Sequence, residues 1–120
     1  MSELFKLVRK NFSEIDNEWR WTYSCLLPFT FKKYTITEIT ITDHFQQKKG
    51  RKKITLALIL TLFQTRINGR KRMKPRKSHG LRDVYVREKV PYDDKKYRLI
   101  FWFKDGTTNH LWIRNCYPID

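Results

Sequence analysis

The stretch DVYVREKVPYDDKKYRLIFWFKDGTTNHLWIRNC, residues 83–116, decides the fold that the sequence predicts. Apolar and polar residues alternate through it, as they do in half-buried strands. Two breaks interrupt the alternation: a turn at 91–96, and Lys104-Asp105-Gly106, which is typical of a hairpin. We therefore expect a three-stranded antiparallel meander over residues 84–119, with strands at 84–90, 97–103 and 108–116.

The two phases of this alternation predict two different sheet faces. The core phase is apolar and comprises Val84, Val86, Val90, Tyr97, Leu99, Phe101, Phe103, Leu111 and Ile113. The opposite phase mixes rings and cations, in Tyr85, Arg87, Lys89, Arg98, Ile100, Trp102, His110, Trp112 and Arg114. Rings can stack on bases while Arg and Lys neutralise phosphates, so this composition is typical of single-stranded RNA recognition. The alternative is a second layer, such as the N-terminal helix, that covers Trp102 and Trp112.

A helix is expected upstream of the meander, over residues 55–68. Its apolar stripe contains Leu56, Ile59, Leu60, Phe63 and Ile67, and Asn68-Gly69 is a typical helix stop. Residues 69–83 then read as a basic loop, because they carry no apolar period. Before the helix, residues 31–42 are rich in Thr and Ile, and a change of phase between Ile36 and Ile39 predicts a bulge or a break between two short strands.

The N-terminal segment is expected to be helical. Residues 2–12 place apolar side chains at helical spacings behind Ser2, Ser13 can cap a second short turn, and residues 26–29 read as an irregular apolar link. The predicted fold class is therefore α+β, with N-terminal helices packed on a C-terminal antiparallel sheet. The 120 residues make one domain: a helical segment at 1–30, strands and the main helix at 31–68, the basic loop at 69–83 and the meander at 84–119.

The charge is high and uneven. Lys and Arg outnumber Asp and Glu by 26 to 12, and 13 of the 26 cations lie between Asp43 and Asp83, where no acidic residue occurs. An ordinary soluble surface mixes both signs, so this distribution predicts binding to a polyanion, most directly RNA. The candidate RNA-binding residues are Lys52, Arg70, Arg72, Arg76, Lys77, Arg82 and Arg87, together with Trp102 and Trp112.

Other classes of function are disfavoured by what the sequence lacks. Cys25 and Cys116 have no metal-ligand spacing, and no cluster of histidines or carboxylates accompanies them, so we expect no metal and no cofactor. Two sparse cysteines fit a reducing compartment, and the charged start of the chain is not a signal peptide. The longest apolar run, residues 54–63, is too short for a bilayer. We therefore expect action in the cytoplasm and no contact with a membrane.

The three histidines permit one kind of chemistry, the cleavage of RNA without a metal. That reaction takes a proton from the 2′-hydroxyl, gives one to the 5′-oxygen and stabilises charge on phosphorus, roles that suit His, Arg and Lys. His79 reads as a solvated residue of the basic loop. For His44 and His110, a structural role is as open as a catalytic one.

A resemblance favours catalysis. The stretch ITDHFQQKKGRKKITLALILTLFQTRING resembles the opening of small RelE/ParE-like proteins, in which a strand is followed by His, basic residues and a helix. The end, YRLIFWFKDGTTNHLWIRNCYP, is similar to the closing hairpin of that family. The resemblance covers roughly residues 39–119. It implies the barnase–EndoU–colicin–RelE (BECR) fold of toxin–antitoxin ribonucleases and contact-dependent inhibition toxins. The longer basic loop and the N-terminal segment depart from the compact members and favour a delivered toxin domain or an atypical member.

By position, the resemblance implies catalytic roles for His44, Lys48, Arg98, Arg114 and Tyr117, and we add His110 because it shares a strand face with Arg114. The leading hypothesis is a metal-independent RNA endonuclease toxin that cleaves tRNA or mRNA and is neutralised by an acidic antitoxin or immunity protein. A non-catalytic RNA- or DNA-binding module and a ParE-type toxin with another target are the alternatives.

Overall fold

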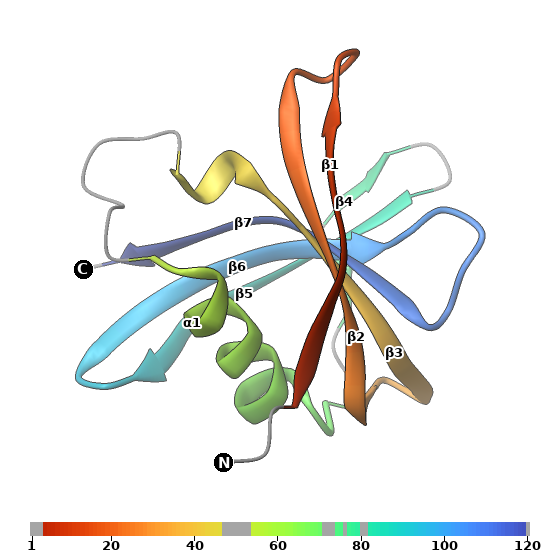
Figure 1. Cartoon of the computed structure of the whole chain (residues 1–120). Helices are drawn as coiled ribbons and strands as arrows, with labels where there is room; N and C mark the ends of the chain where they lie inside the picture. Colours follow the sequence, from red (N-terminus) through yellow and green to blue (C-terminus); the bar gives the residue numbers. More distant parts are fainter. Residues whose placement is uncertain (1–3, 47–53, 71–73, 76, 80–81, 120) are drawn as a thin grey trace.

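The computed structural model describes residues 4–46, 54–70, 74–75, 77–79 and 82–119, which form a mostly β structure (Figure 1). Its elements, in chain order, are β1 Phe5–Ser13, β2 Glu18–Phe31, β3 Tyr34–Thr42, the 3₁₀ turn η1 Asp43–Gln46, α1 Leu56–Leu62, the π-helical turn η2 Phe63–Ile67, β4 Lys77–His79, β5 Arg82–Tyr92, β6 Lys95–Phe103 and β7 His110–Ile119.

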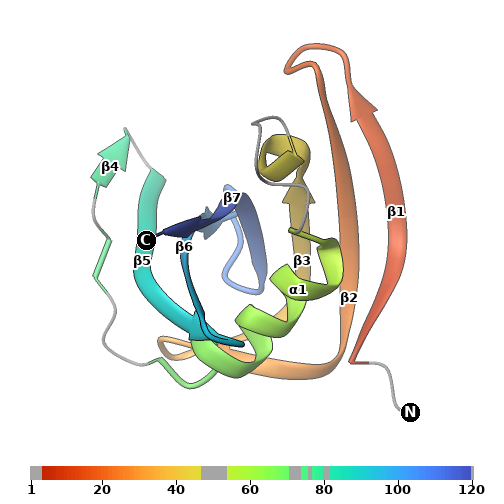
Figure 2. The same ribbon diagram turned by 90° about the vertical axis from the view of Figure 1, so that its left-hand side faces the viewer.

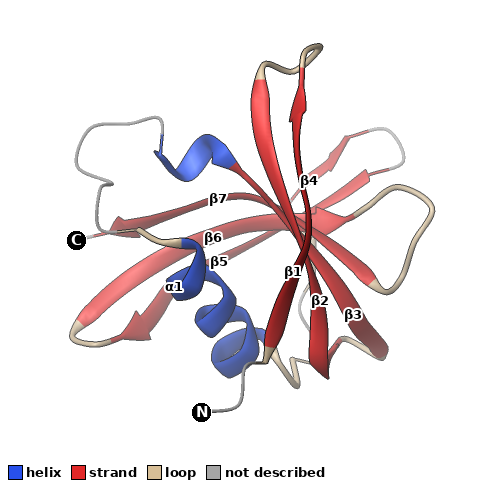
Figure 3. Ribbon diagram, in the orientation of Figure 1, coloured by secondary structure: helices blue, strands red, loops and turns tan. Residues whose placement is uncertain are grey.

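The strands form one mixed sheet in the order β1-β2-β3-β7-β6-β5-β4. β3 and β7 run parallel, with Glu38 opposite His110 and Ile41 opposite Ile113, while every other described neighbour pair is antiparallel. β4 extends the far edge by only three paired residues. Because β3 pairs with β7, the N-terminal strands and the C-terminal meander belong to the same sheet (Figure 3).

The sheet curves around α1, which lies on its inner side (Figure 2). Thr55 caps the helix, since its hydroxyl accepts a hydrogen bond of 3.1 Å from the backbone N–H of Leu58. Ile59 and Phe63 are fully buried, and the ring of Phe63 packs edge-on against Phe101 of β6 at 4.9 Å. The helical region ends at Ile67, before Gly69 with φ +86°, so the expected helix and its stop are confirmed.

The expected N-terminal helices are wrong. Residues 5–13 form the strand β1, which pairs antiparallel with β2, and the segment expected as a second helical turn opens β2. A register shift between Leu7 and Arg9 explains the misleading pattern. The extra residue Val8 changes the phase of a period-two alternation, and apolar residues on the two sides of the bulge then fall at helical spacings.

The predicted fold class is corrected by the same finding. The chain is not a helical N-terminal layer packed on a C-terminal sheet with the BECR arrangement, but a mixed sheet wrapped around one short helix. The apolar link expected at residues 26–29 lies inside β2, at a register shift between Ser24 and Phe29. The change of phase expected near Ile36 faces this irregularity, while β3 itself continues from Tyr34 to Thr42.

The meander is confirmed as strands β5, β6 and β7, and its core phase is largely buried. One part of the phase assignment is wrong. Tyr85 pairs opposite Phe101 and is 4% exposed in the core, whereas Val86 pairs with Ile100 on the other face. A register shift between Arg87 and Val90 reverses the phase within β5, and this reversal hid the true direction of Tyr85.

Part of the region expected as a basic loop is a strand, because Lys77–His79 pairs with β5. Residues 71–73, 76 and 80–81 of that loop lie outside the described residues. In the described part of the chain, no helix has the length and apolarity needed to span a bilayer.

Candidate functional site

The outer face of the sheet, the side away from α1, carries the predicted tryptophans. Trp112 alternates with the buried Leu111 and Ile113, so it must point outward. Strand pairing places Trp102 directly beside it on β6 and Thr40 beside it on β3. Both tryptophans are half-buried. The alternative of an N-terminal helix covering them is wrong, because the N-terminal segment forms strands of the same sheet.

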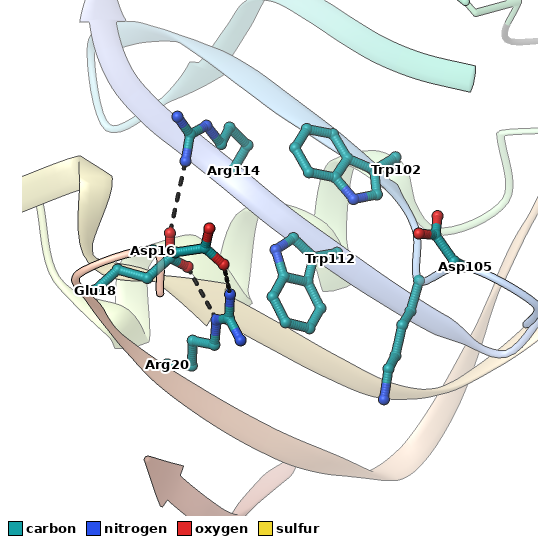
Figure 4. A pocket seen from close by; sticks show the side chains of 8 residues that line it. Asp16, Glu18, Arg20, Trp102, Asp105, Trp112 and Arg114 are labelled. Atoms are coloured by element: carbon teal, nitrogen blue, oxygen red, sulfur yellow. Dashed lines mark hydrogen bonds and ion pairs between the residues drawn. The ribbon is translucent and has the colours of Figure 1, made fainter. Parts of the chain in front are cut away.

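A cavity of about 500 Å³ opens on this face, and we call it the first cavity. Its walls combine two tryptophans, three cations and three carboxylates, from Asp16, Glu18, Arg20, Trp102, Lys104, Asp105, Trp112 and Arg114 (Figure 4). The predicted residues Trp102, Trp112 and Arg114 thus come together with the N-terminal end of β2. A site with aromatic rings and both signs of charge can stack a base, bind a phosphate and supply a group that transfers a proton.

Glu18 is the centre of the charges around the first cavity. Its side chain is 5% exposed. The Nε of Arg20 donates a hydrogen bond of 3.0 Å to its Oε2, while His44 Nε2 and Arg114 Nη1 lie 3.2 Å and 3.7 Å from its Oε1. A buried carboxylate needs such partners because desolvation of an isolated charge is costly. Glu18 therefore holds two guanidinium groups and one imidazole at the same place.

His44 reaches Glu18 from the turn that follows β3. It lies in η1, and the preceding residue, Asp43, accepts a 3.1 Å hydrogen bond from the backbone N–H of Trp19. This contact ties η1 to β2 next to Glu18. The predicted catalytic residue His44 is therefore fixed between two strands, with 20% of its side chain exposed.

A β-bulge aims Arg114 at His44. Ile100 pairs with Asn115 and Phe101 with Ile113, so Arg114 is the extra residue of β7. The hydroxyl of Thr42 donates to the carbonyl oxygens of Ile113 and Arg114, at 3.3 Å and 3.1 Å, and so joins the bulge to β3. Bulges of this kind re-direct a side chain, and here the Arg114 guanidinium contacts His44 Nε2.

Arg20 connects the charged cluster to the aromatic wall. Its guanidinium lies 4.9 Å from the ring centre of Trp112, and its Nη2 contacts Asp16 at 2.5 Å. Figure 4 shows Arg20 beside Trp112, with Glu18 and Asp16 on its other side. A guanidinium on an aromatic face is favourable, and the pair supplies both a cation and a flat surface for stacking.

Arg98 and Tyr117 form a second group further along β6 and β7. They pair across the strands, and the Arg98 guanidinium donates a 2.6 Å hydrogen bond to the Tyr117 hydroxyl and contacts Glu88. The bond to Tyr117, then that to Glu88, raises the pKa of Arg98. Neither residue lines the first cavity. The structure therefore brings His44 and Arg114 together, and separately Arg98 and Tyr117.

His110 has the outward phase expected for it but is 5% exposed. Its Nε2 makes a 2.7 Å hydrogen bond with the hydroxyl of Thr40, and its Nδ1 lies 3.8 Å from a carboxylate oxygen of Glu38. Burial lowers the pKa of His110, although the charge of Glu38 opposes that shift. These contacts make His110 a buried, hydrogen-bonded part of the sheet face.

The other predicted binding residues are not near the first cavity or are not described. Lys48, Lys52, Arg72 and Arg76 lie outside the described residues, as do the side chains of Lys77 and Arg82. Arg70 is exposed after η2, and its Nε donates to the carbonyl of Arg66 at 3.2 Å. Arg87 is half-buried on β5 and pairs opposite the buried Leu99, so it shares the inner phase of Tyr85 and the outward phase predicted for it is wrong.

Sequence reasoning missed Glu18, Arg20 and Asp16, because the sequence predicts a second short helical turn after Ser13. The signal that could have found them is the alternation Glu18-Trp19-Arg20-Trp21, in which both charged residues share one phase of a strand. The Asp16–Arg20 pair also satisfies the spacing of a helical ion pair, and this favoured the wrong period.

A metal centre is not suggested by the described residues, among which no three His, Cys, Asp or Glu side chains form a group that could hold an ion. Both cysteines are buried, and no disulfide joins them. In comparisons with known proteins, no family model, no curated protein and no solved structure matches this chain.

Proposed function

We propose that this protein is a metal-independent endoribonuclease whose active site is the cluster of Glu18, Arg20, His44 and Arg114. One observation carries the proposal. A buried carboxylate, an imidazole and two guanidinium groups meet beside two tryptophans, although they come from β2, η1 and β7. A general base, a general acid and phosphate-binding cations are the three components that RNA cleavage requires.

The reaction uses the neighbouring 2′-hydroxyl of the RNA as nucleophile. Glu18 takes the proton of that hydroxyl, and the 2′-oxygen forms a bond to phosphorus. Protonated His44 gives a proton to the 5′-oxygen as the bond between that oxygen and phosphorus breaks. The products are a 2′,3′-cyclic phosphate and a free 5′-hydroxyl. Arg20 and Arg114 stabilise the charge that develops on the phosphoryl oxygens.

The contacts of His44 Nε2 support this assignment. Nε2 faces both the Arg114 guanidinium, which can only donate, and Glu18 Oε1, which in its ionised form can only accept. A neutral imidazole with no proton on Nε2 accepts from Arg114, and an imidazole with a proton there donates to Glu18. Each protonation state thus has a partner in place, as a group that gains and loses a proton requires.

The tryptophans supply a surface for the bases. Stacking of a base on an aromatic side chain contributes about 1–3 kcal/mol and tolerates any base. Because Trp102 and Trp112 are neighbours across β6 and β7, they offer stacking surfaces next to the proposed reaction centre. An accessible face of this kind favours unpaired RNA, since bases in a double helix are stacked on one another.

The charge of the whole chain supports a toxin with an acidic inhibitor. A ribonuclease with net charge +14 would cleave the RNA of the cell that makes it unless a partner neutralised it. An acidic protein would associate rapidly with such a surface at low ionic strength. We therefore include in the proposal a cytoplasmic site of action and inhibition by an acidic antitoxin or immunity protein.

The decisive experiment incubates the purified protein with unstructured RNA in the presence of a chelator. We expect cleavage that leaves 2′,3′-cyclic phosphate ends. The variant Glu18→Gln should cleave at least about a hundredfold more slowly, the scale of one acid–base group, while Glu14→Gln should cleave normally. Glu14 is the matched control because it is an exposed carboxylate of the same hairpin. Cleavage by Glu18→Gln at the parental rate would refute the assignment.

A non-catalytic RNA-binding module is the second candidate, and the ion pairs of Glu18 favour it. Both oxygens of this carboxylate contact cations, and these ion pairs hold β2, η1 and β7 together without any transfer of a proton. The same experiment separates the candidates. Tight binding of RNA by the parental protein with no cleavage product would select the binding module.

A further inference from the structure

A second cavity, of about 340 Å³, adjoins the first on the outer face. The two share Arg20, Lys104 and Trp112. The second is lined in addition by residues of β1, β2, β3 and β7, namely Arg9, Asn11, Thr22, Thr40 and His110. The shared residues make the cavities two parts of one groove, which continues from the proposed reaction centre towards the edge strand β1.

Strand pairing gives the groove its shape. Arg9 pairs with Thr22, Thr22 with Thr40, and Thr40 with Trp112, so these side chains form one row across four strands. Small threonines occupy the middle of the row and long side chains its ends. Three strand spacings of about 4.8 Å separate the ends by about 14 Å. The groove therefore extends well beyond the first cavity.

The floor of the second cavity is polar and ordered. Thr22, Thr40 and His110 are each at most 5% exposed. The hydroxyls of Thr22 and Thr40 lie 2.9 Å apart, and Thr40 bonds His110 at 2.7 Å. A sheet face destined to be covered by an apolar layer would carry apolar residues here. A hydrogen-bonded polar floor suits a polar ligand instead.

The charges of the two cavities differ in kind. The first contains Asp16, Glu18 and Asp105, whereas the described lining of the second contains cations and no carboxylate. Burial chiefly lowers the pKa of His110, the charge of Glu38 opposes the shift, and the positive charges of Lys104 and Arg9 lower the pKa further. A cavity lined by cations and neutral donors fits an anion. Carboxylates suit the first cavity instead, because the proposed proton transfer takes place there.

We infer that the second cavity binds the phosphate of a neighbouring nucleotide, held by Arg9 and Lys104, so that single-stranded RNA lies across β1, β2, β3 and β7. The choice of RNA as ligand rests on the function proposed above. Trp112 forms a wall of both cavities, and a base stacked on it lies between the scissile phosphate and the phosphate of the second cavity.

The test measures binding of RNA oligonucleotides of increasing length. Fully 2′-O-methylated RNAs of two to eight nucleotides are the probes, because they lack the attacking hydroxyl and stay intact. Fluorescence anisotropy should show a step in affinity as the oligonucleotide becomes long enough to reach the second cavity. The variant Arg9→Ala removes a cation that lines only the second cavity, so it should lose affinity for the long RNAs but less than about twofold for the dinucleotide. The double variant Arg9→Ala/Lys104→Ala should lose about tenfold or more on the long RNAs. The salt slope of the double variant should fall by about 0.7, because one single-strand phosphate is no longer neutralised.

The matched control is Lys10→Ala/Lys33→Ala, which removes the same charge from two exposed positions that line neither cavity. It should leave the length dependence unchanged. The charge-conserving variant Arg9→Lys/Lys104→Arg should keep the parental step in affinity. If the double alanine variant fails to fold, Arg9→Gln alone should lose part of that step.

Equal losses of affinity at every RNA length for Arg9→Ala, or an equal loss of affinity in the control, would overturn the second phosphate site while leaving the proposed function intact. Failure of the parental protein to bind any of these RNAs would instead overturn both.

Discussion

Glu18 Oε1 lies 3.2 Å from His44 Nε2, although 26 positions separate the two residues in the chain. The contact joins the beginning of β2 to the turn after β3. Arg114 reaches the same carboxylate oxygen from the bulge of β7. A carboxylate, an imidazole and a guanidinium are therefore assembled by strand pairing and by the bulge, both properties of the sheet.

The effects of removing His44 and Arg114 on the rate of RNA cleavage should not be additive, because the two side chains act as one unit. We expect His44→Ala and Arg114→Ala each to reduce RNA cleavage by at least about a hundredfold, because each removes one acid–base or electrostatic group. The double variant should cleave little more slowly than either single variant. Cleavage rates on one fluorogenic RNA measure this, with circular dichroism as the control for folding. Additive losses would show that the two side chains act independently.

Trp112 should contribute more to RNA binding than to folding. Trp112→Ala removes a stacking surface and the ring beneath Arg20, so the affinity for single-stranded RNA should fall by about 1–3 kcal/mol. Trp19→Ala is the control, since Trp19 is exposed and alternates with Arg20, which puts it on the opposite face. Anisotropy titrations compare the two variants. An equal loss for Trp19→Ala would contradict a role for the outer face.

His110 should make the protein less stable in mild acid. Its folded-state pKa is lowered, chiefly by burial, while Lys104 and Arg9 add to the shift and Glu38 opposes it. Below the unfolded-state pKa of about 6.5, the unfolded chain binds a proton that the folded chain resists. The contribution of neutral His110 to the free energy of unfolding is therefore complete above about pH 6.5 and is lost as the pH falls below that value. Urea unfolding from pH 7.5 to 5 should show a steeper decline for the parent than for His110→Gln. Parallel profiles would refute this.

Cys25 should be inert in the folded protein. Burial, followed by the nearby charge of Glu38, raises the pKa of its thiol to about 12. At pH 8 only about one molecule in ten thousand then carries the reactive thiolate. Cys116 is fully buried as well. A thiol reagent such as DTNB should modify neither cysteine in native protein and both after unfolding in guanidinium. Rapid reaction of the native protein would show that the thiols are accessible.

The sequence by itself determined the elements whose signals are local. The meander has uninterrupted period-two alternation in β6 and most of β7, and the helix has an apolar stripe with an Asn68-Gly69 stop. The excess of cations and the outward phase of the two tryptophans also follow from the sequence without knowledge of the fold. These predictions depend on spacing between near neighbours, which the chain fixes before it folds.

Only the tertiary structure decided that the N-terminal third forms strands and which residues meet at the candidate site. The bulge at Val8 gives the apolar residues of β1 a helical spacing, because one extra residue shifts every later side chain to the other phase. The parallel pairing of β3 with β7 joins residues 72 positions apart, as Thr42 and Arg114 show. That pairing is favoured by shared burial of Ile39, Ile41, Leu111 and Ile113 against α1. Burial is a property of the packed chain, so no local pattern could place Glu18 beside His44.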